Sequence, residues 1–130
     1  MIGAGSIGFT RKLMTDILTV PELADTHFAF MDISEKNLDM VSQLAQRDIE
    51  ANHLPATITT HMDQLESITD ADYVISTIRM GGLDAFQLDI DIPLQYGIDQ
   101  CVGDTICAVG IMYAQRTIPA LLDICDDIAD

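Results

Sequence analysis

Positive charge is scarce in this sequence of 130 residues. Only 6 residues are Lys or Arg, against 21 that are Asp or Glu, which gives a formal net charge of -15 at pH 7. Binding to DNA, RNA or an anionic membrane surface depends on clustered Lys and Arg, so the composition argues against all three as main partners. We interpret the acidic residues as a solvated, self-repelling surface.

Long hydrophobic runs and paired cysteines are also missing. No apolar run approaches the roughly 20 residues that a membrane span needs, and no basic segment followed by an apolar one opens the chain as in a signal peptide. The three cysteines, Cys101, Cys107 and Cys125, are odd in number and lack the spacing of metal ligands. We therefore expect a protein of the reducing cytoplasm, without a membrane partner.

A glycine-rich turn lies near the beginning of the chain. Gly3, Gly5 and Gly8 form the pattern Gly-x-Gly-x-x-Gly, and Asp32 follows Gly8 by 24 residues. In a nucleotide-binding fold the first glycine permits a tight turn and the second lets the backbone approach a pyrophosphate. The third lets the following helix pack against the strand. The N–H groups at the start of that helix would then face the phosphates.

The acidic residue Asp32 completes the motif. Its carboxylate can accept hydrogen bonds from both ribose hydroxyls and would repel a 2′-phosphate, so the motif favours NAD over NADP. A short apolar strand over residues 28–32 ends in this acid, and a helix-period apolar run follows the glycines. A structural turn with a chance aspartate is the alternative. The apolar face of the first helix is predicted to comprise Phe9, Leu13, Met14, Ile17 and Leu18.

Strands and helices alternate along the rest of the chain. The expected elements are a helix over 34–51 with Ser34 as N-cap, a strand over 56–61, a short helix from Asp63, a strand over 72–78, a helix over 83–96 that Pro93 kinks or breaks, and a helix over 112–130. This order predicts an α/β fold: a Rossmann-like doubly wound parallel sheet with helices on both faces, as in the N-terminal domain of lactate and malate dehydrogenases.

Both ends of the chain suggest truncation. Only Met1 and Ile2 precede Gly3, whereas a first strand supplies about five residues, and an apparent helix runs to Asp130. We therefore expect residues 1–130 to be a single NAD-binding domain truncated at both ends, with a catalytic C-terminal domain absent.

Ligands of a doubly wound sheet bind outside the carboxyl ends of its strands. The glycine turn and Asp32 reach that edge, and so do residues 77–82. In this third segment Ile78 and Met80 would flank the nucleotide, and Gly81 and Gly82 would let the backbone come close to it. A plain turn between a strand and a helix is the alternative.

Longer motifs along the whole chain carry a resemblance to a known family. They are Ile2-Gly3-Ala4-Gly5-Ser6, Met31-Asp32-Ile33, Ala71-Asp72-Tyr73-Val74-Ile75, Ile78-Arg79-Met80-Gly81-Gly82-Leu83, Asp91-Ile92-Pro93, Tyr96-Gly97, Gly103-Asp104-Thr105 and Arg116-Thr117-Ile118-Pro119. Generic dehydrogenases share the first two, and the later motifs are more specific. With them the chain resembles the N-terminal half of the NAD- and manganese-dependent glycosidases, glycoside hydrolase family four.

The resemblance implies an unusual hydrolysis of O-glycosyl bonds, an exception to the two-carboxylate rule. In this family NAD oxidises the sugar C3 hydroxyl, a base removes the C2 hydrogen, and the glycosidic oxygen leaves by elimination. Water then adds, and the return of the hydride to C3 completes the net hydrolysis. Mn²⁺ chelates the sugar oxygens and polarises the carbonyl. The substrate would be a small-molecule glycoside.

The resemblance also implies roles for individual residues. Cofactor-binding positions of the family are matched by Gly3, Gly5, Ser6, Gly8, Asp32, Ile78, Arg79 and Gly81. Asp104 matches an acidic position that faces the sugar, which implies binding to a substrate hydroxyl. Arg116 is expected to secure its helix rather than to touch substrate. The family's Cys and His metal ligands lie beyond residue 130, so no metal ligand and no catalytic residue is assigned within this chain.

One position bears on the substrate. Family members that cleave 6-phospho-glycosides carry an arginine where this chain has Phe86, and Gln-Glu-Thr at 103–105. A phosphate favours a bidentate arginine partner, so its loss favours α-galactosides or α-glucosides without phosphate. Residues 106–109, Ile-Cys-Ala-Val, replace a glycine-rich stretch of the family. The sequence leaves open how this difference affects activity or specificity.

Other readings stay open. The chain could belong to an NAD-dependent oxidoreductase acting on 2-hydroxy acids, or it could be a remnant that binds NAD without catalysis. We expect the isolated chain to be inactive and aggregation-prone, and the full-length protein to form a homo-oligomer, a dimer or tetramer.

Cys107 is interpreted as a buried or loop cysteine because no basic neighbour would activate it. The three histidines, His27, His53 and His61, are expected at the surface or at strand ends.

Overall fold

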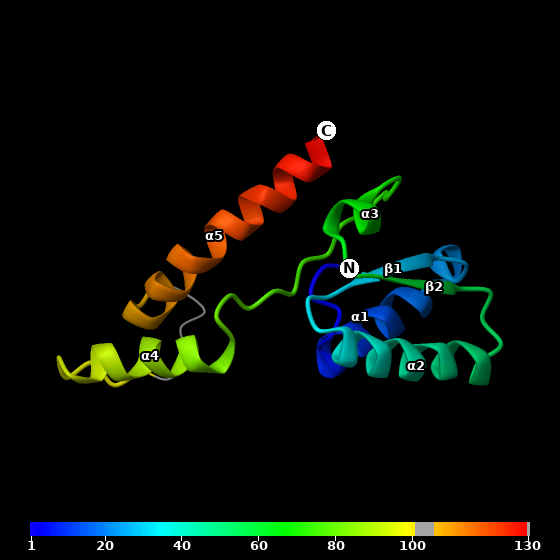
Figure 1. Ribbon diagram of the computed structural model, residues 1–130. Helices are drawn as coiled ribbons and strands as arrows, with labels where there is room; N and C mark the ends of the chain where they lie inside the picture. The colour runs from blue at the N-terminus through cyan, green and yellow to red at the C-terminus, as the bar shows by residue number, and fades with distance from the viewer. Residues whose placement is uncertain (101–105, 130) are drawn as a thin grey trace. The chain divides into compact units, whose positions relative to one another are not determined.

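A computed structural model describes residues 1–100 and 106–129 of the chain. The chain divides into two compact units, Met1–Thr77 and Ile78–Asp130, and each is described by itself (Figure 1).

The first unit alternates helices and strands as predicted. Its elements are α1 (Ile7–Leu18), the 3-10 helix η1 (Pro21–Leu23), β1 (His27–Met31), α2 (Glu35–Ala51), β2 (Thr57–His61) and α3 (Gln64–Ile68). Strands β1 and β2 are parallel and pair from His27 opposite Thr57 to Met31 opposite His61. The predicted N-caps Ser34 and Asp63 each accept a backbone hydrogen bond at the start of α2 and α3.

Ile2 extends this sheet beyond β1. It forms parallel bridges with Met31 on one side and with Ser76 on the other. The order is therefore β2, β1, Ile2, Ser76, in which the chain moves outward from Ile2 first to one side and then to the other. That is the strand order of a doubly wound sheet at its switch point, so the predicted α/β fold with a parallel sheet is confirmed.

The predicted strand over residues 72–78 is wrong in extent. Only Ser76 pairs, through a bond of 2.8 Å from the Ile2 N–H to the Ile75 carbonyl and another from the Thr77 N–H to the Ile2 carbonyl. A parallel ladder needs a partner along its length, and on this side the segment meets only the short stretch that ends at Ile2. The apolar residues within 72–78 indicated a strand at the correct place. The stretch at Ile2 with which this segment pairs is too short to extend the pairing beyond Ser76.

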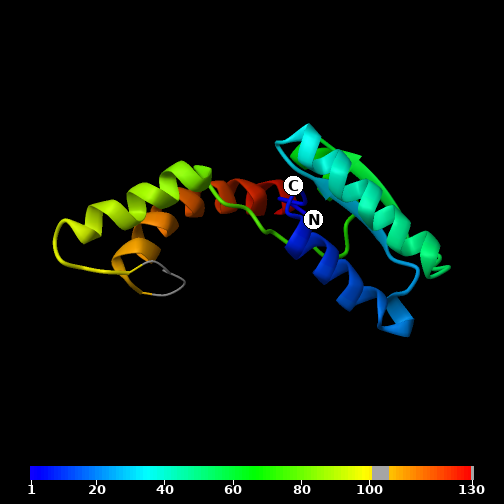
Figure 2. The same cartoon turned by 90° about the horizontal axis from the view of Figure 1, so that it is seen from below.

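The core of this unit lies between the strands and the helices α1 and α2, which run along one face of the strands (Figures 1 and 2). Helix α3 lies on the other side of the strands (Figure 1). The buried cluster consists of Ala4, Met14, Leu18, Phe28, Phe30, Leu38, Ala45, Ile49 and Ala56. The predicted inward face of α1 is partly wrong, because Phe9 is 66% exposed and Thr10 is buried in its place.

The second unit is a pair of helices, α4 (Gly82–Leu94) and α5 (Ala108–Ala129), which pack against each other. Pro93 lies in the last turn of α4, which ends at the next residue, in agreement with the predicted break. Helix α5 begins four residues before the predicted start, and the Cys107 sulfur accepts a bond of 3.3 Å from the Gly110 N–H in its first turn. Cys107 is thus engaged at a helix start, as expected of a structural cysteine.

No helix among residues 1–100 and 106–129 is long and apolar enough to cross a membrane. His27 and His61 lie at the start of β1 and the end of β2, and His53 is exposed, as predicted.

Candidate functional site

The glycine turn leaves the sheet at Gly3. This residue has a φ of 84°, in the left-handed region that glycine adopts without strain. The N–H groups of Gly3 and Ala4 both donate to the Met31 carbonyl, at 2.9 Å each. The chain therefore turns sharply at the carboxyl edge of the sheet, directly beside the end of β1, as the motif predicts.

Two threonine hydroxyls hold the carbonyl groups of this turn. Thr10 Oγ1 donates to the Ala4 carbonyl at 2.8 Å, and Thr77 Oγ1 donates to the Gly3 carbonyl at 3.0 Å. Sequence reasoning missed both residues. The available signal for Thr10 was its place one turn into α1 on the side that Met14 and Leu18 share, where a buried hydroxyl must find an acceptor.

Asp32 lies against the glycine turn. Its Oδ2 accepts a hydrogen bond of 2.7 Å from the Gly5 N–H, and its Oδ1 accepts one of 2.8 Å from the Ser34 N–H. A carboxylate oxygen can accept more than one bond, so the half-buried carboxylate keeps acceptor capacity for a ligand. These two bonds fix its orientation in advance.

Gly5 is required to be glycine by Asp32 itself. A Cβ atom at this position would lie 2.7 Å from both the Cγ and the Oδ2 atoms of Asp32. The structure therefore gives Gly5 a requirement for glycine that comes from Asp32, and the approach of its backbone to a pyrophosphate stays a prediction. The glycine turn and Asp32 therefore depend on each other for their local structure.

Ser6 and Gly8 lie at the start of α1. Ser6 lies where a phosphate-binding residue is expected, whereas Gly8 does not pack as predicted. Ser6 is the N-cap residue, but its side chain makes no capping hydrogen bond, which leaves the hydroxyl available at a helix N-terminus. The packing role predicted for Gly8 is wrong among the described residues, because an added Cβ would meet nothing within 4 Å. Gly8 is exposed on the outer side of its helix.

The third predicted segment, residues 77–82, belongs to the second unit from Ile78 onward. The Ile78 carbonyl accepts a bond of 2.9 Å from the Tyr113 hydroxyl. Gly81 is the N-cap of α4 with a φ of 83°, and an added Cβ would lie 2.4 Å from the Ala85 Cβ. This turn therefore has its own local requirement for glycine, which the alternative of a plain turn would share.

Arg79 in the same segment is held by aromatic rings. Its guanidinium carbon lies 5.0 Å from the Phe86 ring centroid and 5.4 Å from that of Tyr113, both within cation–π range. Among the residues that the structure describes, Arg79 forms no ion pair. Its side chain is exposed, so its N–H donors can reach an anion from solution.

The remaining predictions concern the sugar and the metal. Asp104 and the motif 103–105 lie outside the described residues. Within residues 1–100 and 106–129 no group of three or more His, Cys, Asp or Glu side chains could hold a metal ion.

The geometry fits a dinucleotide at one edge of the first unit. The turn at Gly3, the uncapped helix start at Ser6 and the oriented Asp32 carboxylate are the three elements that such a ligand requires. Fold and site together define an α/β domain of the Rossmann type.

Comparison with known proteins identifies the family. The model of the family 4 glycosyl hydrolases matches residues 1–130, and the chain belongs to this family. It is 57% identical over 130 residues to an alpha-galactosidase of Rhizobium meliloti (strain 1021), a match that covers the whole chain and 26% of that relative. It is 35% identical to an alpha-galactosidase of Bacillus subtilis (strain 168), covering 99% of the chain and 30% of the relative.

The fold agrees with a solved structure of the family. The 6-phospho-beta glucosidase of Thermotoga maritima, solved with manganese, NAD+ and glucose-6-phosphate, has a TM-score of 0.85 and 28% identity, covering 98% of this chain and 30% of that one. The chain therefore spans less than a third of the length of these relatives.

Proposed function

We propose that this chain binds NAD as part of a glycosidase that hydrolyses α-galactosides or α-glucosides. The observation that carries the proposal is the coupling of Asp32 to the glycine turn through the Gly5 N–H. Membership of the family and the identity of 57% to an alpha-galactosidase support it. The NAD+ bound in the Thermotoga maritima structure is the cofactor that such a turn would hold.

In this proposal the first unit binds the cofactor's phosphates and one ribose. Gly3 and Gly5 keep side chains away from the turn, and Gly8 leaves the start of α1 without a side chain beside the cofactor. The Ser6 hydroxyl and the N–H groups of the first turn of α1 donate to the pyrophosphate. Asp32 accepts hydrogen bonds from the ribose hydroxyls with the lone pairs that Gly5 and Ser34 leave free.

Residues 78–82 and residue 104 complete the proposed site. Ile78 packs beside the cofactor, Gly81 brings backbone close to it, and Arg79 offers guanidinium donors that the rings of Phe86 and Tyr113 hold in place. Asp104 accepts a hydrogen bond from a sugar hydroxyl.

Bound NAD supplies reversible oxidation of the sugar C3 hydroxyl, which acidifies the C2 hydrogen and lets the glycosidic oxygen leave by elimination. The described residues do not provide a metal site, so none of the roles assigned to them involves Mn²⁺. Manganese in the Thermotoga maritima structure supports the prediction that Mn²⁺ is a second cofactor, held by residues beyond residue 130.

The proposed substrate carries no phosphate. Phe86 stands where an arginine would be needed to bind a phosphate by two hydrogen bonds, and its ring instead supports Arg79. The higher identity to an alpha-galactosidase, 57% against 32% for the 6-phospho-beta-glucosidase of Escherichia coli (strain K12), points the same way. Cytoplasmic location and assembly as a dimer or tetramer remain predictions.

Deuterium exchange at C2 tests this function. The natural gene product is incubated with p-nitrophenyl α-galactoside, NAD+ and Mn²⁺ in D₂O, and the released galactose is analysed by NMR. We expect hydrolysis only when both cofactors are present. We also expect the released galactose to carry deuterium at C2, because the C2 proton is lost to a base and replaced from solvent. Hydrolysis without deuterium at C2 would indicate the two-carboxylate mechanism and refute the proposal.

A further inference from the structure

Helix α5 holds the segment that leads into α4 at two points. The Tyr113 hydroxyl donates to the Ile78 carbonyl at 2.9 Å, and Arg116 Nε lies 3.5 Å from the Met80 carbonyl oxygen, at the long end of hydrogen-bond range. Residues three apart in a helix lie on one face, so Tyr113 and Arg116 reach the segment from the same side. The two carbonyls that they contact belong to alternate residues.

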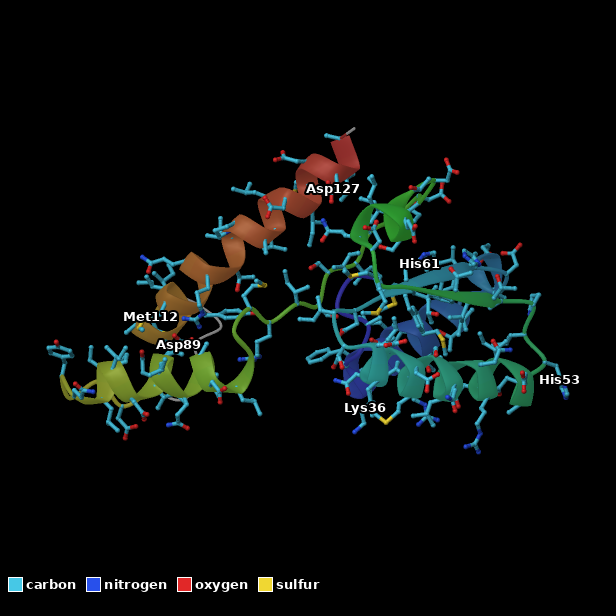
Figure 3. The ribbon with its side chains drawn as sticks, viewed as in Figure 1. Lys36, His53, His61, Asp89, Met112 and Asp127 are labelled. Carbon is cyan, nitrogen blue, oxygen red and sulfur yellow. The ribbon has the colours of Figure 1, made fainter. Side chains whose placement is uncertain are left out.

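A buried carboxylate fixes Arg116 in this position. Asp89 of α4 is 0% exposed, and its two oxygens accept bonds from Arg116, Oδ1 from Nη1 at 2.8 Å and Oδ2 from Nη2. Figure 3 shows Asp89 on the side of α4 that faces α5. The hydrogen bonds from Arg116 to Asp89 raise the pKa of the guanidinium, so this group stays charged. A bidentate pair of this kind fixes the orientation of both side chains.

The same two residues of α5 contact Ile78, Arg79 and Met80. The Tyr113 ring lies under the Arg79 guanidinium as well as beside Ile78. A Cβ at Gly81 would lie 3.5 Å from Arg116 Nε, so Gly81 lies close to the Arg116 side chain. Helix α5 therefore supports residues 78–81 of the segment that the proposed function brings to the cofactor.

Stability alone does not account for an ion pair at this place, in which Asp89 is buried and the Arg116 side chain is 33% exposed. Apolar side chains of similar size commonly hold two helices together as well as such a pair, or better. What the pair adds is direction, since a guanidinium anchored on Asp89 can point Nε at one carbonyl. A tyrosine hydroxyl adds the same specificity at Ile78.

We propose that Asp89, Tyr113 and Arg116 are positioning residues, which set the backbone of residues 78–82 in the conformation that binds NAD. The proposal rests on the proposed function, which places this segment at the cofactor. None of the three touches the cofactor; they act through the carbonyls of Ile78 and Met80.

Two variants test the proposal. Tyr113→Phe removes one hydroxyl and keeps the ring under Arg79. The double variant Asp89→Leu/Arg116→Met replaces the ion pair by apolar side chains, which preserves packing. The matched control is Asp48→Leu/Arg11→Met, because Arg11 and Asp48 form another bidentate pair, with bonds of 2.5 and 2.9 Å, on α1 and α2 of the first unit.

Three measurements are made on the whole chain: the melting temperature, the affinity for NAD+ by calorimetry, and amide hydrogen exchange of residues 78–82. We expect Tyr113→Phe to weaken NAD+ binding about threefold to tenfold, the loss of one positioning hydrogen bond, and the double variant to weaken it about tenfold or more. Both should melt within a few degrees of the parent and exchange faster at 78–82. The control should change neither affinity nor exchange at 78–82.

The contrary results are equally definite. Parent-like affinity and exchange in Tyr113→Phe and in the double variant would assign these residues a structural role only and overturn the proposal. If the double variant fails to fold, Tyr113→Phe decides by itself. If the parent does not bind NAD+, the proposed function fails. Amide exchange at residues 78–82 then still shows whether these side chains hold the segment, because it is faster in the variants than in the parent only if they do.

Discussion

At the scale of single residues, the candidate site depends on how Asp32 meets the glycine turn. The carboxylate is held by two backbone N–H groups, and it occupies the space that a side chain at Gly5 would need. Gly5 is thus confined by its surroundings, whereas Gly8 has open space around it.

Alanine at the two positions should have opposite effects. Gly5→Ala forces a Cβ to within 2.7 Å of the Asp32 carboxylate and should destabilise the fold by about 1–3 kcal/mol, as overpacking does. Gly8→Ala meets open space in a helix and should be neutral or stabilise by up to about 1 kcal/mol. Urea unfolding measures both, and equal destabilisation by the two variants would contradict the structure.

The pair of Arg11 and Asp48 predicts a dependence on pH. Hydrogen bonds from Arg11 lower the pKa of the Asp48 carboxyl, so the carboxylate is favoured in the folded state. A depressed pKa stabilises the fold above the unfolded value, about 3.9, and this contribution is lost as the pH falls through the folded pKa. We expect Asp48→Asn to melt below the parent at pH 6 and to approach it at about pH 3, in paired thermal scans. A gap that widens on acidification would be the wrong sign.

At the scale of elements, much of the fold was predictable from local signals. Helices α1, α2 and α3 follow from apolar periodicity and from caps such as Ser34 and Asp63. The extent of pairing at residues 72–78 was predicted too long, although the sequence already showed that only Met1 and Ile2, the stretch with which this segment pairs, precede the glycine turn. Side-chain bonds across 27 or 74 residues of sequence, such as those of Arg116 and Thr77, have no periodic signal.

The link between α1 and the glycine turn gives an element-scale prediction. Thr10→Val keeps the shape of a buried side chain but leaves the Ala4 carbonyl without its 2.8 Å bond, which should cost about 1–3 kcal/mol. Thr15→Val is the control, because Thr15 makes a similar bond to the Arg11 carbonyl on the exposed side of the same helix. Chemical denaturation compares the two. Equal losses would show that the Thr10 bond has no special role.

At the scale of the whole molecule, two properties oppose each other. The net charge of -15 keeps copies of the chain apart, whereas many large apolar side chains are exposed, among them Phe9, Leu83, Tyr96 and Ile106. Repulsion between surface charges is screened by salt, and apolar attraction is not weakened by it.

The balance predicts self-association that depends on salt. In sedimentation velocity runs at about 20 mM and about 500 mM NaCl, we expect a mostly monomeric chain at low salt and larger species at high salt, since the Debye length falls well below 10 Å. A sample that remains monomeric and melts cooperatively at both salt concentrations would refute the expectation that exposed apolar side chains drive self-association.

The central claim is that the glycine turn and Asp32 bind NAD. The most direct test is a calorimetric titration of the folded chain with NAD+, with NADP+ as the comparison and Asp32→Ala as the variant. We predict binding of NAD+ that exceeds binding of NADP+ and is lost in Asp32→Ala, because the carboxylate that accepts from Gly5 is the group that would receive the ribose hydroxyls. Equal binding of both dinucleotides, or no effect of Asp32→Ala, would contradict the claim.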